Sequence, residues 1–412
     1  MSLEKLNILL NKEVGLLKEK GTAKGKETVV TGLKPADGKK GTRYFIQGKG
    51  KKEFIRMNSN SYLGMSLRKD VIKAEEKAAR QFGAGPGGVR FISGTYKAHI
   101  LLEEKVAEFH SREEAMIFSS AYAASLGVIA PLATRETLFV SDELNHNCII
   151  QAMRLSMSGE KFIYKHNNMD DLQGRLEDAV GRGKRVVVVT DGVFSMRGDI
   201  CPLGELVAIC SKYEGDFEEG IITIVDDSHG VGALGKTGRG TEEYTNSKAD
   251  ILIGTLGKGF GVNGGYVTAS SAVIQYLRET APTYIYSNPI TVAEAAAAEK
   301  AIDILHGAEG EKILEHLHRM TKKFETGLIE SGYETIKGDH PVVPLMVREP
   351  QKTSELVAYL TKNGILATGL NFPVVPRGDE EIRFQITADH TEFDIDCVLG
   401  ILEKYRGLQS KS

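Results

Sequence analysis

The fold is decided by residues 221–261, IITIVDDSHGVGALGKTGRGTEEYTNSKADILIGTLGKGFG. Two apolar runs in this stretch, IITIV and ILIG, are rich in β-branched residues, and polar residues follow each of them. Short apolar runs of this composition predict buried strands. In parallel sheets, the loops that leave the carboxyl ends of the strands line the ligand crevice. The polar residues of DDSH and TLGK are therefore expected to face a common site.

The same pattern continues on the N-terminal side of this stretch. Strand-like runs occur at 114–119 (EAMIFS), 136–141 (ETLFVS) and 184–192 (KRVVVVTDG). Helix-like stretches lie between the runs, at 99–111, 148–158, 169–183 and 203–213. Strands that alternate with helices of this length predict an α/β fold, with a mostly parallel sheet covered by helices on both faces.

The chain divides into three predicted parts. Residues 1–58 form an N-terminal helix and an arm: Leu6, Leu9, Leu10 and Leu17 recur at helical spacing, and Gly21 can end the helix. This amphipathic helix is expected to pack on the body or on a second subunit. Residues 59–301 form the large domain. Residues 302–412 form a smaller α+β domain, with strands in HPVVPLMVRE and EEIRFQITA and a helix in SELVAYLTKNG.

Composition excludes several classes of protein. The 412 residues carry a formal net charge of -3, which argues against a dedicated nucleic-acid binder. No apolar run reaches the ~18 residues that a membrane span needs, and charged residues interrupt the N-terminal leucines, so no secretion signal is predicted. The four cysteines lack C-x-x-C spacing, so we expect reduced thiols, no metal site and a cytoplasmic location.

Two glycine-rich motifs imitate nucleotide-binding signatures. Residues 230–237, GVGALGKT, match the phosphate-loop pattern, but Gly238 and Gly240 follow at once and oppose the helix that such a loop must start. Gly259, Gly261 and Gly264 spell G-x-G-x-x-G, yet the expected acidic residue about 20 positions later is replaced by APTYIYSNP. We therefore predict neither a nucleotide triphosphatase nor a dehydrogenase.

A cofactor site is the better interpretation of the polar strand ends. Lys258 follows a predicted strand, and a lysine desolvated in a pocket can lose its proton and form a Schiff base. Asp226 and His229 follow another strand; a pyridoxal phosphate ring needs a carboxylate at its nitrogen to act as an electron sink. Taken alone, this D-x-x-H pair also suits a metal pair or a helix cap, and His146 alone suits a structural role.

Nine ordered segments carry a resemblance to a known family. They are NSNSYLGM (58–65), GGVRFISGTYKAHILLE (87–103), SDELNHNCII (141–150), TDGVFSM (190–196), VDDSHGVG (225–232), GTLGKGFG (254–261), YIYSNP (284–289), TGLNFPVVPRG (368–378) and IRFQITADHT (382–391). The sequence resembles the α-oxoamine synthases, pyridoxal-phosphate enzymes of the aspartate-aminotransferase-like fold (fold type I). The resemblance spans most of the chain.

The resemblance implies a role for each matching residue. Lys258 would hold the cofactor covalently and act as base and acid at the substrate carbon, while Asp226 would pair with the ring nitrogen. His229 and Ser195 would hydrogen-bond the ring oxygen, and His146 would stack on the ring. These roles make Lys258, His146, Asp226 and His229 the implied catalytic set.

The remaining implied roles concern the phosphate and the substrate. The phosphate would meet the backbone N–H groups of Ala121 and Tyr122 at a helix start, with hydroxyls from Thr255 and from Ser287 of the partner subunit. This shared site implies a homodimer. Asn60 and Arg383 would hold the substrate carboxylate, since a guanidinium fork suits that bidentate contact.

The implied reaction joins an amino acid to an acyl-CoA and releases CoA. TGLNFPVVPRG and TDGVFSM favour glycine C-acetyltransferases, which use glycine and acetyl-CoA and form 2-amino-3-ketobutyrate. GKGFGVNGG also resembles 8-amino-7-oxononanoate synthases, which use alanine and a pimeloyl thioester, and a serine palmitoyltransferase-like preference stays open. A catalytically inactive relative is disfavoured because Lys258 is retained.

The chain departs from the family pattern at four positions. Ala121 stands where relatives often carry Gly, and Ser125 where they often carry Asn. Arg197 occupies a place where Asp is common, and Ser61 replaces a frequent Asn or Asp. These changes leave the implied core roles intact and bear on acyl-chain or amino-acid choice.

Overall fold

A computed structural model describes residues 3–409 apart from 21, 24 and 373. Within these residues, seven strands form the main sheet in the order β4-β10-β9-β8-β7-β5-β6. Strands β5 to β9 are mutually parallel, whereas β10 runs antiparallel to both β9 and β4. The predicted α/β fold with a mostly parallel sheet is confirmed. The strands are β4 (Glu114–Phe118), β5 (Thr137–Asp142), β6 (Lys161–Tyr164), β7 (Arg185–Asp191), β8 (Ile221–Asp226), β9 (Ile251–Thr255) and β10 (Gly265–Ala269).

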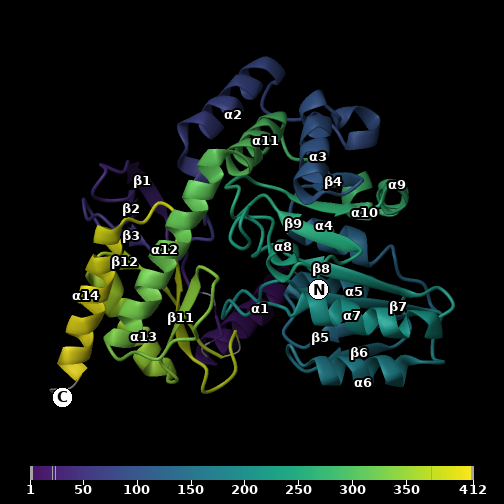
Figure 1. Cartoon of the computed structure of the whole chain (residues 1–412). Coiled ribbons are helices and arrows are strands. Elements are labelled where there is room, and N and C mark those ends of the chain that lie inside the picture. Colours follow the sequence, from purple (N-terminus) through teal and green to yellow (C-terminus); the bar gives the residue numbers. More distant parts are fainter. Residues whose placement is uncertain (1–2, 21, 24, 373, 410–412) are drawn as a thin grey trace.

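Helices cover both faces of this sheet (Figure 1). Alternate residues of β7 enter different clusters: Val186 and Val188 pack with helices α3, α6 and α7, and Val187 and Val189 with α4, α5 and α9. This period of two places apolar residues on both faces, as a covered parallel sheet requires. The helices of this region are α2 (Lys69–Phe82), α3 (Lys97–His110), α4 (Ala121–Ile129), α5 (Asn147–Leu155), α6 (Met169–Ala179), α7 (Leu203–Tyr213), α8 (Thr241–Thr245), α9 (Ser271–Thr280), α10 (Pro282–Ile285) and α11 (Val292–His306), with short helices η1 (Met65–Leu67), η2 (Arg90–Gly94) and η3 (Glu214–Asp216).

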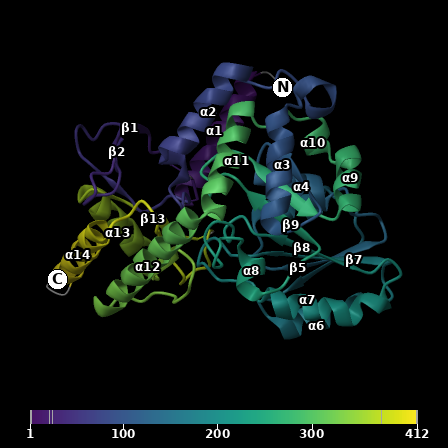
Figure 2. The ribbon, with the colours of Figure 1, turned by 45° about the horizontal axis from the view of Figure 1, so that its top comes forward.

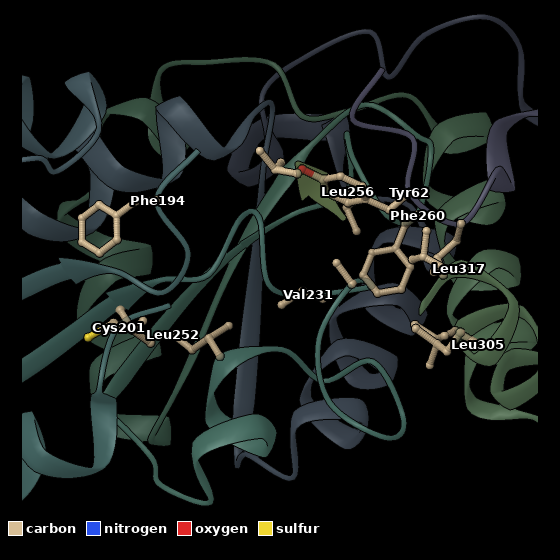
Figure 3. Close-up of a cluster of buried hydrophobic side chains, with 14 of the residues drawn as sticks. Tyr62, Phe194, Cys201, Val231, Leu252, Leu256, Phe260, Leu305 and Leu317 are labelled. Carbon is tan, nitrogen blue, oxygen red and sulfur yellow. The ribbon is translucent and has the colours of Figure 1, made fainter. Parts of the chain in front are cut away.

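The larger core cluster extends from the sheet into the C-terminal helices. Figure 3 shows part of it, from Phe194 and Leu252 near the sheet to Leu305 and Leu317 on α11 and α12 (Ala308–Glu330). Helix α11 also packs against α2 and α3, and Figure 2 shows the three helices together. Because one apolar cluster joins the two regions, the elements that flank the strand ends are held in fixed positions.

The C-terminal elements form a second lobe beside the main sheet (Figure 1). Its antiparallel sheet has the order β11 (Val342–Met346), β14 (Glu381–Gln385), β13 (Thr368–Leu370), and the helices are α12, α13 (Pro350–Lys362) and α14 (Glu392–Gln409). Strand β12 (Ile365–Leu366) pairs with β3 (Ile55–Arg56) in parallel, so the chain enters this lobe before it builds the main sheet. The boundaries after residues 58 and 301 stay predictions.

The N-terminal segment contains a helix and a hairpin. No residue of helix α1 (Leu3–Glu19) is buried, and β1 (Val30–Lys34) pairs with β2 (Arg43–Ile46) antiparallel. The arm lies on α14, where Arg43 forms a buried ion pair with Asp394. Gly21, predicted to end the helix, and Pro373, within the segment 368–378, lie outside the described residues. Across the described ranges, none of the helices combines the length and apolar character needed to cross a membrane.

Candidate active site

The parallel strands of the main sheet end in polar residues along one edge. Strands β7, β8 and β9 end at Asp191, Asp226 and Thr255. The edge opens into a cavity of about 300 Å³, a size at the lower end for small-molecule sites. Its lining comprises Ala121, Tyr122, His146, Cys148, Asp191, Val193, Ser195, Asp226, Ser228, His229, Thr255 and Lys258. Eight residues predicted for the cofactor thus lie around a single cavity.

Lys258 lies in the loop between β9 and β10. Leu256 and Phe260 on either side of it are fully buried, so the loop is anchored at two points while the lysine faces the cavity. Burial lowers the pKa of the Lys258 amine, although the carboxylates of Asp226 and Asp191 oppose the shift. A lowered pKa increases the fraction of neutral amine, which is the nucleophilic form.

Asp226 is buried at the end of β8 and is held by three donors. Its Oδ2 accepts hydrogen bonds from the Ser125 hydroxyl at 3.1 Å and from the Cys148 thiol at 3.5 Å. Its Oδ1 accepts the backbone N–H of Ser228 at 3.1 Å. These contacts fix the carboxylate at the cavity wall, where it can pair with a cationic N–H of a bound ring.

His146 is the N-cap residue of α5 and is tied to β7. Its backbone N–H donates to Asp191 Oδ2 at 2.8 Å, and its ring Nδ1 lies 2.9 Å from Cys148 Sγ. Burial lowers the pKa of His146, with Asp226 opposing the shift. A neutral imidazole with an orientation fixed by these contacts suits stacking on an aromatic ring.

His229 is fixed by a hydrogen bond from the N-terminal part of the chain. Its Nδ1 lies 2.7 Å from the hydroxyl of Tyr62, a residue with no exposed surface. Burial, with the charge of Lys258 next, lowers the pKa of His229 well below its ordinary value. The imidazole is therefore neutral, and Nε2 is the ring nitrogen left for a ligand.

The first turn of α4 forms the end of the cavity where a phosphate is predicted. Helix α4 begins at Ala121, and its cap Ser120 accepts the N–H of Ala123 at 3.1 Å. The first N–H groups of a helix have no partner within it, and they attract anions. A Cβ on Gly265 would lie 2.2 Å from the backbone nitrogen of Ala121, so only glycine allows β10 to approach this turn.

These features fit pyridoxal phosphate. A helix N-terminus, an amine of lowered pKa and an anchored carboxylate line one cavity of suitable volume. The buried hydroxyl of Ser228 also lines it and has no hydrogen-bond partner among the described residues, as expected of a group that meets a ligand.

Three predicted site residues lie outside the lining of this cavity. Asn60 and Arg383 are brought together across more than 300 residues, with Arg383 Nη2 donating to Asn60 Oδ1 at 3.3 Å. The amide of Gln385 also contacts Asn60. Ser287 is not among the lining residues of the single chain. Its role from a partner subunit stays a prediction, as do the individual roles of the other site residues.

Sequence reasoning missed four lining residues: Cys148, Asp191, Val193 and Ser228. Asp191 ends the VVVVTD run, and the strand-end argument used for Asp226 applies to it equally. Cys148 lies two positions after His146, and the His146 ring, as the N-cap of the helix, accepts the backbone N–H of Cys148. Val193 and Ser228 carry no comparable signal.

A histidine outside the cavity joins two of the site loops. His166 Nδ1 lies 3.1 Å from Asp142, at the end of β5, and Nε2 lies 3.3 Å from Asp199, after β7. Burial lowers the pKa of His166, but the hydrogen bonds to Asp142 and then Asp199 outweigh it and raise the pKa to about 9. The protonated form therefore binds the loops that follow β5 and β7 together.

This ion-pair triad predicts a pH-dependent stability. The folded pKa exceeds the unfolded value of 6.5, so the stabilisation is complete below pH 6.5 and is lost as pH rises through about 9. We expect the free energy of unfolding, measured in urea, to fall by about 2 kcal/mol more in the wild type than in His166→Gln between pH 6.5 and 9.5. Equal slopes in the two proteins would contradict the assignment.

Residues 52–402 match the family described as aminotransferase class I and II. The mitochondrial 2-amino-3-ketobutyrate coenzyme A ligase of Bos taurus is 37% identical over 406 residues, which cover 98% of this chain and 93% of that protein. The 8-amino-7-oxononanoate synthase 1 of Bacillus velezensis is 36% identical over 372 residues, 90% of this chain and 92% of that protein. The chain belongs to the α-oxoamine synthase family.

Solved structures agree with this membership. A serine palmitoyltransferase from Sphingomonas wittichii superposes with a TM-score of 0.88 at 27% identity, over 100% of this chain and 99% of that one. A serine palmitoyltransferase from S. paucimobilis, solved with a PLP–myriocin aldimine, gives 0.86 at 27% identity over the whole of both chains. The predicted family and its aminotransferase-like fold are confirmed. Because relatives with different substrates match this α-oxoamine synthase about equally, identity alone does not select the substrate.

Proposed function

We propose that the protein joins glycine to acetyl-CoA with pyridoxal phosphate as its cofactor, and that 2-amino-3-ketobutyrate and CoA are the products. The observation that carries the proposal is the juxtaposition, around one cavity, of the Lys258 amine and the Asp226 carboxylate. Family membership supports the general reaction, an amino acid with an acyl-CoA. The segments TGLNFPVVPRG and TDGVFSM favour the acetyl transfer.

When bound, pyridoxal phosphate supplies an aldehyde that takes an amine covalently and a ring that accepts the electron pair of a departing Cα proton. Lys258 would supply the amine that holds the cofactor, and its neutral form would serve as the base for the Cα proton of the substrate. Its lowered pKa suits both tasks. The new C–C bond forms between the glycine Cα and the thioester carbonyl carbon, and the CoA thiolate leaves.

The other residues would hold the cofactor and orient the amino-acid substrate. Asp226 would keep a proton on the ring nitrogen, and His229 and Ser195 would hydrogen-bond the ring oxygen. His146 would stack on the ring, while the N–H groups of Ala121 and Tyr122 and the Thr255 hydroxyl would bind the phosphate. Arg383, supported by Asn60, binds the amino-acid carboxylate.

The substrate is tested by thiol release. Glycine, alanine and serine are each combined with acetyl-, pimeloyl- and palmitoyl-CoA, and free CoA is followed. We expect the largest kcat/KM with glycine and acetyl-CoA. Turnover with alanine and pimeloyl-CoA alone would establish the second candidate, which the relatives named 8-amino-7-oxononanoate synthase support.

We further propose a homodimer in the cytoplasm. No residue of α1 is buried on its own chain, and its leucines Leu6, Leu9 and Leu10 are exposed, which favours packing on a second subunit. All four cysteines are free thiols, in keeping with a reducing compartment. Sedimentation equilibrium tests the dimer, and a monomer with full activity would contradict it.

A further inference from the structure

Glu381 is a buried carboxyl group without a hydrogen-bond partner. It begins β14 and has no exposed surface, and neither Oε1 nor Oε2 has a partner among the described residues. A carboxylate in this state is costly unless neighbouring charges compensate it. Burial raises the pKa of Glu381 to about 7, with Arg197 and then Arg383 opposing the rise.

Four charged residues influence Glu381, two anions and two cations. Asp199, an anion nearby, is bound to His166. Asp379, the other anion, lies 2.6 Å from Arg197 and 3.5 Å from Arg348. The two cations near Glu381 are Arg197, from the loop after β7, and Arg383, from its own strand. The charge of Glu381 is therefore opposed by one cation of the main-sheet region and one cation of the C-terminal lobe.

Arg383 is a second residue with an unsatisfied group. It lies two positions after Glu381, so both side chains project from the same face of β14. Its Nη2 donates to Asn60, while its buried Nε has no hydrogen-bond partner among the described residues. Glu381 and Arg383 are thus neighbours of opposite charge that do not hydrogen-bond each other. If they paired, the guanidinium would turn from Asn60 toward Glu381.

We propose that Arg197 is a positioning residue for Arg383: it neutralises the buried carboxylate of Glu381 and so leaves the Arg383 guanidinium available for the substrate carboxylate. This inference rests on the proposed function, in which Arg383 binds the amino acid. It assigns a task to Arg197, which occupies a position where relatives often carry an acidic residue.

The test measures glycine binding rather than turnover. Glycine is titrated into the cofactor-loaded protein, and the change in cofactor absorbance gives a dissociation constant. In Arg197→Met, Glu381 is left to capture Arg383, so we expect glycine to bind about tenfold more weakly. In the double variant R197M/E381Q the unpaired carboxylate of Glu381 is gone, while Asp199 and Asp379 keep their partners His166 and Arg348, so binding should return to within about threefold of the wild type. A purely structural role for Arg197 predicts no such recovery.

Matched controls separate this effect from a general disturbance. Arg197→Lys keeps the charge and should bind glycine within about twofold of the wild type. Asp379→Asn should do the same, because it removes the partly buried ion pair with Arg197 but keeps the charge of Arg197 near Glu381. Glu381→Gln alone should bind glycine at least as tightly as the wild type. Circular dichroism and thermal melting check the fold of each variant, and Glu381→Gln still tests the proposal if Arg197→Met fails to fold.

Two results would overturn the proposal: unchanged glycine affinity in Arg197→Met, or affinity in R197M/E381Q as weak as in the single variant. Weaker glycine binding by Glu381→Gln would do the same. Failure of the proposed function would give a different experimental result. In that case the wild type releases no CoA from any donor, whereas the glycine titrations still report on Arg197.

Discussion

Replacing Lys258 by alanine is expected to remove both the visible absorbance of the cofactor-loaded protein and at least about 10³-fold of its turnover. Lys258, in the loop between β9 and β10, lines the cavity, and burial lowers the pKa of its amine. Alanine supplies neither the covalent attachment nor the base. The absorption spectrum after addition of pyridoxal phosphate and the rate of CoA release measure the two losses separately.

A matched control is available in the same chain. Lys236 also lies in a glycine-rich loop that follows a strand, but it is exposed and does not line the cofactor cavity. Lys236→Ala should keep the absorbance and turnover of the wild type. If Lys258→Ala stays coloured and turns over normally, the assignment of the site is wrong.

Replacing Asp226 by asparagine should reduce turnover by about 10³-fold while the fold is preserved. Asparagine has nearly the shape of aspartate, and its side-chain oxygen can still accept the hydrogen bonds of Ser125 or Ser228. It lacks the charge that keeps a proton on the ring nitrogen, so the ring becomes a poorer acceptor of electrons. The rate of glycine Cα–H exchange in deuterated water measures the affected step without acyl-CoA.

The adjacent aspartate gives the opposite expectation. Asp227 accepts the Thr241 N–H and the Thr241 hydroxyl, both at 2.6 Å, in a fully buried position away from the cavity. Asp227→Asn would place amide hydrogens against these donors, so its thermal midpoint should fall by several degrees. Loss of cofactor chemistry in Asp226→Asn and loss of stability in Asp227→Asn together would separate the two carboxylates. Equal effects in both variants would argue against a special role for Asp226.

The elements that the sequence predicts best are those with regular apolar runs. Strands β7 to β9 contain consecutive Val and Ile residues. Helix α7 occupies the predicted stretch 203–213. The sequence pattern does not predict strand β10, because GYVTA begins with a glycine and follows a glycine-rich loop. Its antiparallel insertion between β4 and β9 depends on long-range pairing, which local periodicity does not report.

The site was predictable where polar residues directly follow strands and where family motifs match. Asp226 and Lys258 satisfy both conditions, and the structure places them on one cavity. The hydrogen bond from Tyr62 to His229 joins residues 167 positions apart, and no spacing rule anticipates it. The burial of Glu381 was equally unpredictable from the sequence. EEIRFQ has the pattern of an ordinary strand, and its first two residues are acidic and would be expected on the surface.

The antiparallel strand β10 has a consequence for how the protein emerges from the ribosome. Strand β4 is made early, yet its neighbour in the sheet is completed only at Ala269, some 150 residues later in synthesis. Until then the nascent sheet exposes the unpaired edges of β4 and β9, which invite association with other chains. The helix turn at Ala121 likewise acquires its final wall only when Gly265 arrives. Nascent chains that end before Ala269 are therefore the ones that most need chaperone protection. None of them has the complete wall that the phosphate end of the cofactor cavity requires.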